Sequence, residues 1–352
     1  MKDFHSRILR WYEKQKRPLP WRKNKDPYRI WISEIMLQQT RVEAVIPYFE
    51  RFLSHFPTIK SLANAPEDKV TNLWAGLGYY SRARNLHKAA IEIEQKFQGK
   101  MPQTKEELLE LPGIGDYTAS AIASIAYEAP HIALDGNLER VLSRVLGEKK
   151  DPKKEARPSL LTFGKKLTAK GKAGDINQAL MDLSASICLP KNPHCPLCPI
   201  ENFCLARKNN LTEKIPFKKK KLPPIELQSY GWILFSEIKG VKKVLLTRRK
   251  KKTWLAGMWD LPWWLEEDGK ILAPHTWEKT GVFKTKRTIT KYKIHFSLVF
   301  YRVKKIPQEK QLKDFLHSAG EEFRWCSLEE LEQYNLPRPS EKALEAALHK
   351  LN

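Results

Sequence analysis

The sequence contains no long apolar run, and this absence argues against an integral membrane protein. Its first turns carry Asp3, His5, Arg7 and Arg10, so it also lacks the apolar core of a secretory signal. We therefore expect a cytoplasmic protein. Acidic residues are scarce: 40 Asp and Glu stand against 63 Lys and Arg, a formal net charge of +23. Such an excess favours a polyanionic partner, nucleic acid first of all, although a merely basic soluble protein would carry the same charge.

Cysteine is scarce too, yet four of the five cysteines fall within seventeen residues, at Cys188, Cys195, Cys198 and Cys204. In a reducing compartment this C-x6-C-x2-C-x5-C cluster indicates a metal site rather than disulfides. Four thiolates so close in sequence can surround one centre, and the interleaved prolines reduce the chain entropy that opposes binding. The spacing alone leaves zinc and iron open.

The length of 352 residues suits two domains. Helical periodicity interrupted by prolines predicts an all-α domain over residues 1–207. Lys218, Lys219, Lys220 and Lys221, followed by Pro223 and Pro224, indicate a linker over 208–225. These lysines are interpreted as a solvated run, with contact to phosphate as the alternative. β-rich runs followed by a helical end predict an α+β domain over 226–352.

A glycine turn, LPGIG at 111–115, stands between two helical segments. Gly113 and Gly115 would expose backbone N–H groups that can hold a phosphate, although an ordinary corner between helices has the same pattern. Some twenty residues later, Asp135 stands at the start of the next predicted helix. Together these features resemble the helix-hairpin-helix of the endonuclease III superfamily of DNA glycosylases, which places a catalytic Asp at this point.

Four longer sequence strings indicate which family within this superfamily the chain resembles. LPWR at 19–22, PYRIWISEIMLQQT at 27–40, GLGYYSRAR at 76–84 and INQ at 176–178 are very similar to the MutY family of adenine DNA glycosylases. Glu34 stands among apolar residues in the second string, which predicts a raised pKa for its carboxyl. A carboxylic acid kept protonated is what protonation of a nucleobase requires; an exposed helical Glu is the alternative.

The resemblance implies a base-excision repair enzyme that flips and hydrolytically removes adenine mispaired with 8-oxoguanine or guanine in duplex DNA. In it Glu34 is the general acid, and Asp135 stabilises or traps the oxocarbenium ion. The other implied roles are orientation of Asp135 by Asn137, support of the acid by Tyr117, filling of the base stack by Gln39 and Tyr79, and contact with the substrate by Arg22, Leu37 and Gln178.

The same resemblance makes the cysteine loop the site of one [4Fe–4S] cluster that closes the glycosylase domain. It also separates two branches of the superfamily. In the branch with lyase activity a Lys stands at position 117 and attacks the sugar as a Schiff-base nucleophile. A phenol cannot form a Schiff base, so Tyr117 predicts a monofunctional glycosylase that leaves an abasic site.

The second half is similar to the Nudix-type domain of MutY enzymes, in WLAGMWDLP at 254–262 and RWCSLEEL at 324–331. The metal-binding cluster of active Nudix hydrolases is missing, so we expect this domain to read a base. In the family a Phe-Ser-His string on a loop between strands contacts oxidised guanine. Here Phe296 and Ser297 are followed by Leu298, which leaves the first two as candidate contacts and ordinary strand packing as the alternative.

We therefore expect a monomer, associated with a bacterial nucleoid, that binds duplex DNA containing the mispaired adenine. Proteins of replication or mismatch repair are further candidate partners. Two other hypotheses stay open. A glycosylase-lyase acting on oxidised pyrimidines should carry Lys at position 117, and a non-catalytic DNA-binding protein would have no reason to pair Glu34 with Asp135.

Overall fold

The computed structural model describes residues 2–217, 222–238, 240–250, 254–255, 257–268, 273–334 and 336–349. By its internal contacts the chain separates into two compact units, residues 1–220 and 221–352, which are described one at a time. The lysine run at 218–221 lies outside the described residues. No helix in the described ranges is long and apolar enough to cross a membrane.

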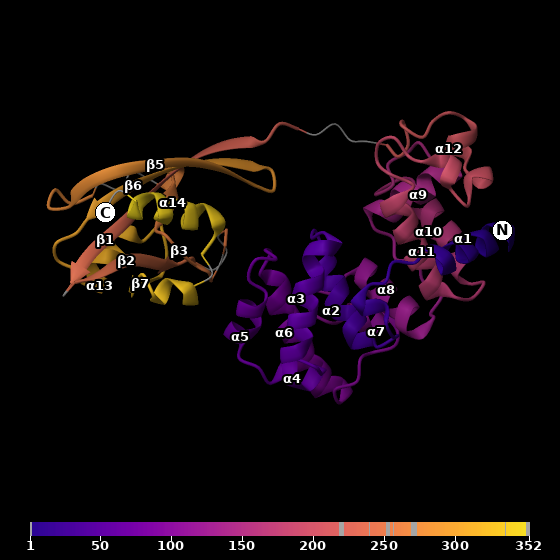
Figure 1. Ribbon diagram of the computed structural model, residues 1–352, viewed down its shortest axis with the longest axis horizontal. Coiled ribbons are helices and arrows are strands. Elements are labelled where there is room, and N and C mark those ends of the chain that lie inside the picture. Colours follow the sequence, from indigo (N-terminus) through magenta and orange to yellow (C-terminus); the bar gives the residue numbers. More distant parts are fainter. Residues whose placement is uncertain are drawn as a thin grey trace. The chain divides into compact units, whose positions relative to one another are not determined.

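Unit 1 is built from helices, as Figure 1 shows. They are α1 (Lys2–Gln15), α2 (Pro27–Leu37), α3 (Val42–His55), α4 (Ile59–Ala63), α5 (Glu67–Leu73), α6 (Ser81–Phe97), α7 (Lys105–Leu109), α8 (Asp116–Tyr127), α9 (Gly136–Leu146), α10 (Arg157–Thr168), α11 (Ala173–Ser186) and α12 (Leu205–Lys208), with 3-10 turns at Pro20–Arg22, Cys195–Leu197 and Glu201–Phe203. The expected all-α first domain is confirmed.

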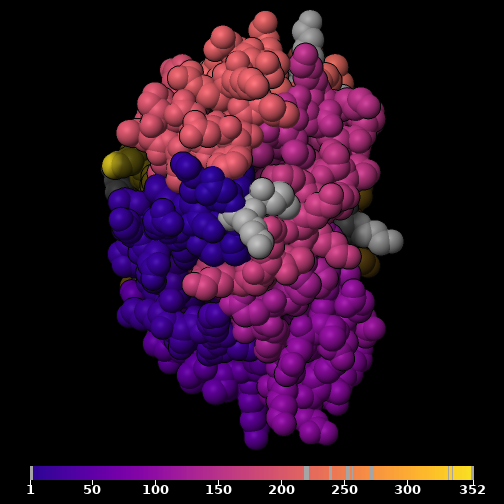
Figure 2. Space-filling model, turned by 90° about the vertical axis from the view of Figure 1, so that its right-hand side faces the viewer, coloured from indigo at the N-terminus to yellow at the C-terminus, as the bar shows by residue number. Residues whose placement is uncertain are grey.

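Two apolar cores stabilise this unit. The first surrounds α2, α3, α6 and α8 and includes the fully buried Trp31 and Trp74. The second joins α1, α9 and α11. Helix α1 contributes Phe4, Ile8 and Tyr12, which recur every four residues and therefore share one helix face. Phe4 also meets Phe203 edge to face at 5.7 Å, and in Figure 2 the indigo N-terminal helix lies against the salmon segment near residue 200. The N-terminal helix thus packs on the cysteine loop.

Unit 2 is a sheet in the order β3-β2-β1-β6-β5, with β4 on β1 and β7 on β2. Only β1 and β6 run parallel among the described pairs. Its elements are β1 (Ile225–Ile238), β2 (Val241–Arg248), β3 (Trp259–Asp260), β4 (Trp263–Leu265), β5 (Glu278–Ile289), β6 (Tyr292–Arg302), α13 (Glu309–Leu316), β7 (Glu322–Ser327) and α14 (Arg338–Leu348), with 3-10 turns at Glu266–Asp268 and Glu330–Gln333. The expected α+β second domain is confirmed.

Successive side chains of β1 point to opposite faces of this sheet, as the pleat requires. Ile233 and Phe235 join the core that contains Leu344 of α14. Trp232 and Leu234 join the core that contains Leu312 of α13. The sheet is therefore covered by one helix on each face.

Candidate active site

An open cleft in unit 1, with an empty volume of about 950 Å³, is bordered by α2, α8, α11 and the start of α9. Segments more than a hundred residues apart meet there. Of the residues singled out in the sequence, the cleft gathers Arg22, Glu34, Leu37, Tyr117, Asp135, Asn137 and Gln178. Both carboxyl groups that the proposed chemistry needs therefore border one space.

Glu34 lies on α2, a helix that begins at Pro27 behind the N-cap Asp26. Only 5% of its surface is exposed, and this burial raises the pKa of its carboxyl to about 7. A hydrogen bond with Tyr117 opposes the rise in pKa, and the negative charge of Asp135 adds to it. Glu34 Oε2 is buried with no hydrogen-bond partner among the described residues, so it is free to bond a group that enters the cleft.

Tyr117 is the second residue of α8, directly after the glycine turn. Burial raises the pKa of its phenol well above the usual value, and the nearby carboxyls of Glu34 and Asp135 raise it further. The hydroxyl therefore stays protonated and acts as a hydrogen-bond donor toward Glu34.

Asp135 is the N-cap of α9, and its carboxylate is held by three donors. Oδ1 accepts from the backbone N–H of Asn137 at 3.0 Å and of Leu138 at 2.8 Å. Oδ2 accepts from Asn137 Nδ2 at 2.9 Å. The bond from Asn137 Nδ2 agrees with the predicted role of Asn137 in orienting Asp135. The backbone N–H groups of the helix end that Asp135 caps also fix its carboxylate.

Helix α9 connects Asp135 with the cysteine loop. Arg140 Nη1 donates to Asn137 Oδ1 at 3.0 Å, while its Nε donates to the carbonyl of Cys188 at 2.9 Å. One turn further, the buried Arg144 donates to Cys188 Sγ at 3.4 Å and to the Leu189 carbonyl at 2.7 Å. Two guanidinium groups therefore brace the first cysteine from the helix that carries Asp135.

The four clustered cysteines line one shared pocket in unit 1. Burial raises the pKa of the Cys198 thiol to about 12 and also raises the pKa of Cys195 and Cys204. The charges of Arg207 and Arg144 lower the pKa of Cys195, and backbone N–H groups lower those of Cys198 and Cys204, but burial outweighs both. Metal coordination would stabilise the thiolates further. Within the described ranges, no three His, Cys, Asp or Glu side chains converge on a site for a single metal ion.

Comparisons with known proteins agree with this geometry. Residues 32–165 match the HhH-GPD superfamily of base excision DNA repair proteins, and residues 234–346 match the NUDIX domain family. The chain is 35% identical to an adenine DNA glycosylase of Buchnera aphidicola subsp. Acyrthosiphon pisum over 357 residues, which cover 97% of each protein. It is 34% identical to the adenine DNA glycosylase of Homo sapiens over 310 residues, which cover 74% of this chain and 57% of the human protein.

The chain belongs to the adenine DNA glycosylase family. Its members are base-excision repair enzymes that hydrolyse N-glycosidic bonds. Among solved structures, the chain is similar to a thermostable thymine-DNA glycosylase, with a TM-score of 0.55 and 29% identity over 59% of this chain and 96% of that one. Endonuclease III bound to DNA shares the fold at a TM-score of 0.50 and 22% identity, covering 59% of this chain and 94% of that one.

In this glycosylase Arg22 borders the cleft, but its guanidinium is engaged. Nη1 and Nη2 make a two-pronged bond with the carboxylate of Asp182, at 2.7 and 3.1 Å. Arg17 Nε donates to the same carboxylate at 2.7 Å, and only 3% of Asp182 is exposed. Sequence reasoning missed Arg17 and Asp182 because their partners lie about 160 residues away and no local motif marks them. The expected contact of Arg22 with substrate stays a prediction.

The INQ string divides between the core and the cleft of the glycosylase. Gln178 borders the cleft, as expected. Asn177 is fully buried and holds the segment before α9: it accepts from the Ala133 N–H at 2.9 Å and donates to the His131 carbonyl at 2.8 Å. Asn177 therefore positions residues 131–134, the segment that leads into Asp135.

Four predicted DNA contacts lie outside the lining of the cleft. Gln39 and Tyr79 are exposed, with backbone φ angles of 60° and 50°. Gly113 has a φ of 79°, and a Cβ there would lie 2.7 Å from Asn85 Cβ, so the turn requires glycine. Gly115 caps α8 and has open space where a Cβ would stand. Their contact with DNA stays a prediction.

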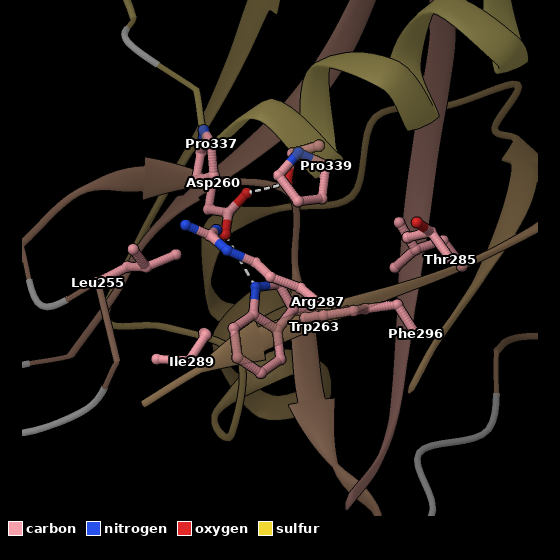
Figure 3. A pocket seen from close by; sticks show the side chains of 11 residues that line it. Leu255, Asp260, Trp263, Thr285, Arg287, Ile289, Phe296, Pro337 and Pro339 are labelled. Atoms are coloured by element: carbon pink, nitrogen blue, oxygen red, sulfur yellow. Dashed lines mark hydrogen bonds between the residues drawn. The ribbon is translucent and has the colours of Figure 1, made fainter. Parts of the chain in front are cut away.

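Phe296 and Ser297 lie within strand β6 and not on a loop between strands, where the family has its Phe-Ser-His string. Phe296 is only 7% exposed and meets Trp263 edge to face at 5.1 Å. Figure 3 shows it lining a small interior pocket of unit 2 with Trp263 and Thr285. Strand packing therefore accounts for Phe296. Ser297 points to the other face, in register with Tyr230 and Lys284. A contact of Ser297 with 8-oxoguanine stays a prediction.

Proposed function

We propose that this chain releases adenine mispaired with 8-oxoguanine or guanine from duplex DNA and leaves an abasic site. One observation carries the proposal: a buried carboxyl whose pKa is raised to about 7 shares a cleft with a second carboxylate fixed at a helix N-terminus. An acid and an oriented anion on one cleft are what cleavage through a cationic sugar requires.

The residues divide the chemistry as follows. Adenine flipped into the cleft takes a proton from Glu34 on a ring nitrogen, and the N-glycosidic bond breaks with its electron pair going to the base. The Asp135 carboxylate stabilises the positive charge on the sugar or bonds to its anomeric carbon. Water then forms the new C–O bond, displacing the Asp135 carboxylate with its electron pair where that bond has formed, and gives a proton back to Glu34. Tyr117 holds Glu34 in place through its hydroxyl.

The monofunctional assignment is supported by the lining of the cleft. No lysine is found among the lining residues that the structure describes, and a phenol stands at position 117. Schiff-base attack on the sugar would need a primary amine beside the reacting carbon. The lyase hypothesis therefore has no nucleophile in this cleft.

The four cysteines suit the [4Fe–4S] cluster that the sequence resemblance implies, because all four line one pocket. Thiolates are the ligands that such a cluster requires. A cluster bound by Cys188, Cys195, Cys198 and Cys204 would supply iron–thiolate bonds that tie the loop together.

The partner that fits the charge is duplex DNA, and we place the enzyme at the nucleoid because that substrate is there. Recognition of 8-oxoguanine is assigned to unit 2, since Glu34 and Asp135 can act on the adenine without inspecting the base opposite. This assignment includes Ser297 as a candidate donor. Proteins of replication or mismatch repair stay candidate partners.

Glu34→Gln tests the proposal directly. An amide keeps the shape of the side chain but cannot deliver the proton, so release of adenine under single turnover should fall by at least ~10²-fold while duplex binding is kept. Glu43→Gln, on the neighbouring helix α3, is the matched control and should react like the unmodified protein. Near-normal release by Glu34→Gln would contradict the proposed chemistry.

A further inference from the structure

Arg82, in the first turn of α6, joins two backbone segments of unit 1 through its guanidinium. Nη1 reaches the end of α2 and Nη2 reaches the loop before α6. The hydrogen bonds run from Nη1 to the carbonyls of Ile35 at 2.7 Å, Met36 at 3.1 Å and Gln38 at 2.6 Å, and from Nη2 to the carbonyls of Leu77 at 3.0 Å and Gly78 at 3.1 Å.

These hydrogen bonds stabilise the C-terminal end of α2 most. The last carbonyls of a helix have no partners within it, and a cation there is favoured by the helix dipole. The guanidinium also lies over the rings of Trp74 and Tyr79, at 5.3 and 5.7 Å from their centres. Burial lowers the pKa of Arg82, but an arginine stays protonated. The guanidinium therefore keeps its charge and its donors, and we call its bridge between the two segments the Arg82 clamp.

Each clamped segment leads directly into an exposed side chain with a left-handed backbone. Gln39 follows the Gln38 carbonyl, and Tyr79, which is 57% exposed, follows the Gly78 carbonyl. Residues other than glycine keep a positive φ only where their surroundings hold them. Here one guanidinium holds the residue before each of them.

We propose that Arg82 is a positioning residue that fixes Gln39 and Tyr79 relative to each other, so that both can enter the base stack when adenine leaves it. The inference rests on the proposed function. It assigns Arg82 to extrusion of the base and not to the proton transfer, because its hydrogen bonds end on the two segments and not on Glu34 or Asp135.

The test compares Arg82→Lys with the unmodified protein on two DNA substrates. In one, adenine stands opposite 8-oxoguanine in a full duplex; in the other, the neighbouring pairs are mismatched so that adenine is already unstacked. Lysine keeps the charge but has one nitrogen, which cannot span both segments. Release from the duplex should fall roughly 10- to 10²-fold, as for displaced catalytic geometry, and release from the mismatched substrate should stay near normal. With 2-aminopurine in place of adenine, the fluorescence rise on binding the duplex should shrink.

Arg51→Lys is the matched control, because Arg51 is exposed and donates to a single carbonyl in this region, that of Leu73 at 3.3 Å. It should behave like the unmodified protein on both substrates. Should Arg82→Lys fail to fold, Tyr79→Ala replaces it, since this exposed side chain should show the same loss confined to the duplex. Equal losses on both substrates, or none on either, would overturn the inference. Failure of the proposed function would be visible separately, as no adenine release by the unmodified protein.

Discussion

Glu34 resists ionisation because α2 has almost no exposed face. Eight of its eleven residues are buried, and the carboxyl lies in the last of its buried turns, where burial limits the solvation of a charge. Tyr117 and Arg22 lower the pKa but do not cancel the effect of burial, so the value stays near 7. An acid with a pKa near the working pH keeps a useful protonated fraction and still gives up its proton readily.

The rate of base release should therefore depend on the proton of Glu34. The pKa is raised, so the active acid is present below about pH 7 and is lost as the pH rises through that value. We expect the single-turnover rate to fall about tenfold per pH unit on the alkaline side. A rate that stays flat from pH 6 to pH 9 would mean that no group of this pKa limits the reaction.

Tyr117→Phe should move this alkaline limb in a defined direction. The hydrogen bond from Tyr117 lowers the pKa of Glu34, so its removal should raise that pKa and shift the midpoint of the rate profile to higher pH. Tyr127→Phe is the control, because the Tyr127 hydroxyl donates to the Met101 carbonyl at 3.1 Å and lies outside the lining of the cleft. A midpoint that moves to lower pH in Tyr117→Phe would contradict the assigned contact.

At the scale of elements, α9 joins the reacting end of the cleft to the cysteine loop. Arg140 contacts Asn137, Cys188 and Ser184, three residues of three different segments. A bond to a charged group of this kind contributes roughly 1.5–3 kcal/mol, so its loss should be felt at both ends. The cysteine loop and Asp135 are thus expected to lose order together.

Arg140→Gln should therefore lower two quantities in the same protein. We expect less iron and sulfide per chain after purification without air, and adenine release slowed by roughly tenfold or more. Arg157→Gln is a suitable comparison, because Arg157 is partly exposed and pairs with Glu139 and Asp116 rather than with the loop. If Arg140→Gln kept both its iron content and its rate of adenine release, the contacts made by α9 would not couple the cysteine loop to the reaction.

Features of the elements that depend on local sequence could be predicted, whereas those that depend on distant contacts could not. The cap at Asp135, the glycine at position 113 and the apolar setting of Glu34 are local patterns, and each was predictable from neighbours in the chain. The pairing of Arg22 with Asp182 and the clamp made by Arg82 depend on contacts 160 and 44 to 47 residues apart, which no local pattern encodes. For Phe296 the alternating apolar string left strand packing and a base contact both open, and its burial against Trp263 within β6 favours packing.

At the scale of the whole molecule, each unit has its own apolar cores, so each should fold without the other. A chain ending at residue 217 should still release adenine, although more slowly. It should also lose most of its preference for adenine opposite 8-oxoguanine over adenine opposite guanine. The reason is that the proposed reader of the opposite base lies in unit 2. The ratio of the two binding constants, at one fixed salt concentration, measures this preference. An unchanged ratio in the shortened chain would remove unit 2 from the recognition step.

The most direct test of the account is to identify the base that the full chain releases from a duplex with adenine opposite 8-oxoguanine. Under single turnover, with the products separated by chromatography and the strands analysed without alkali or heat, we predict free adenine and an intact strand with one abasic site. The same duplex with thymine in place of the adenine should yield no free base. Release of a pyrimidine, cleavage of the strand coupled to base loss, or no base at all would contradict an adenine glycosylase that works through Glu34 and Asp135.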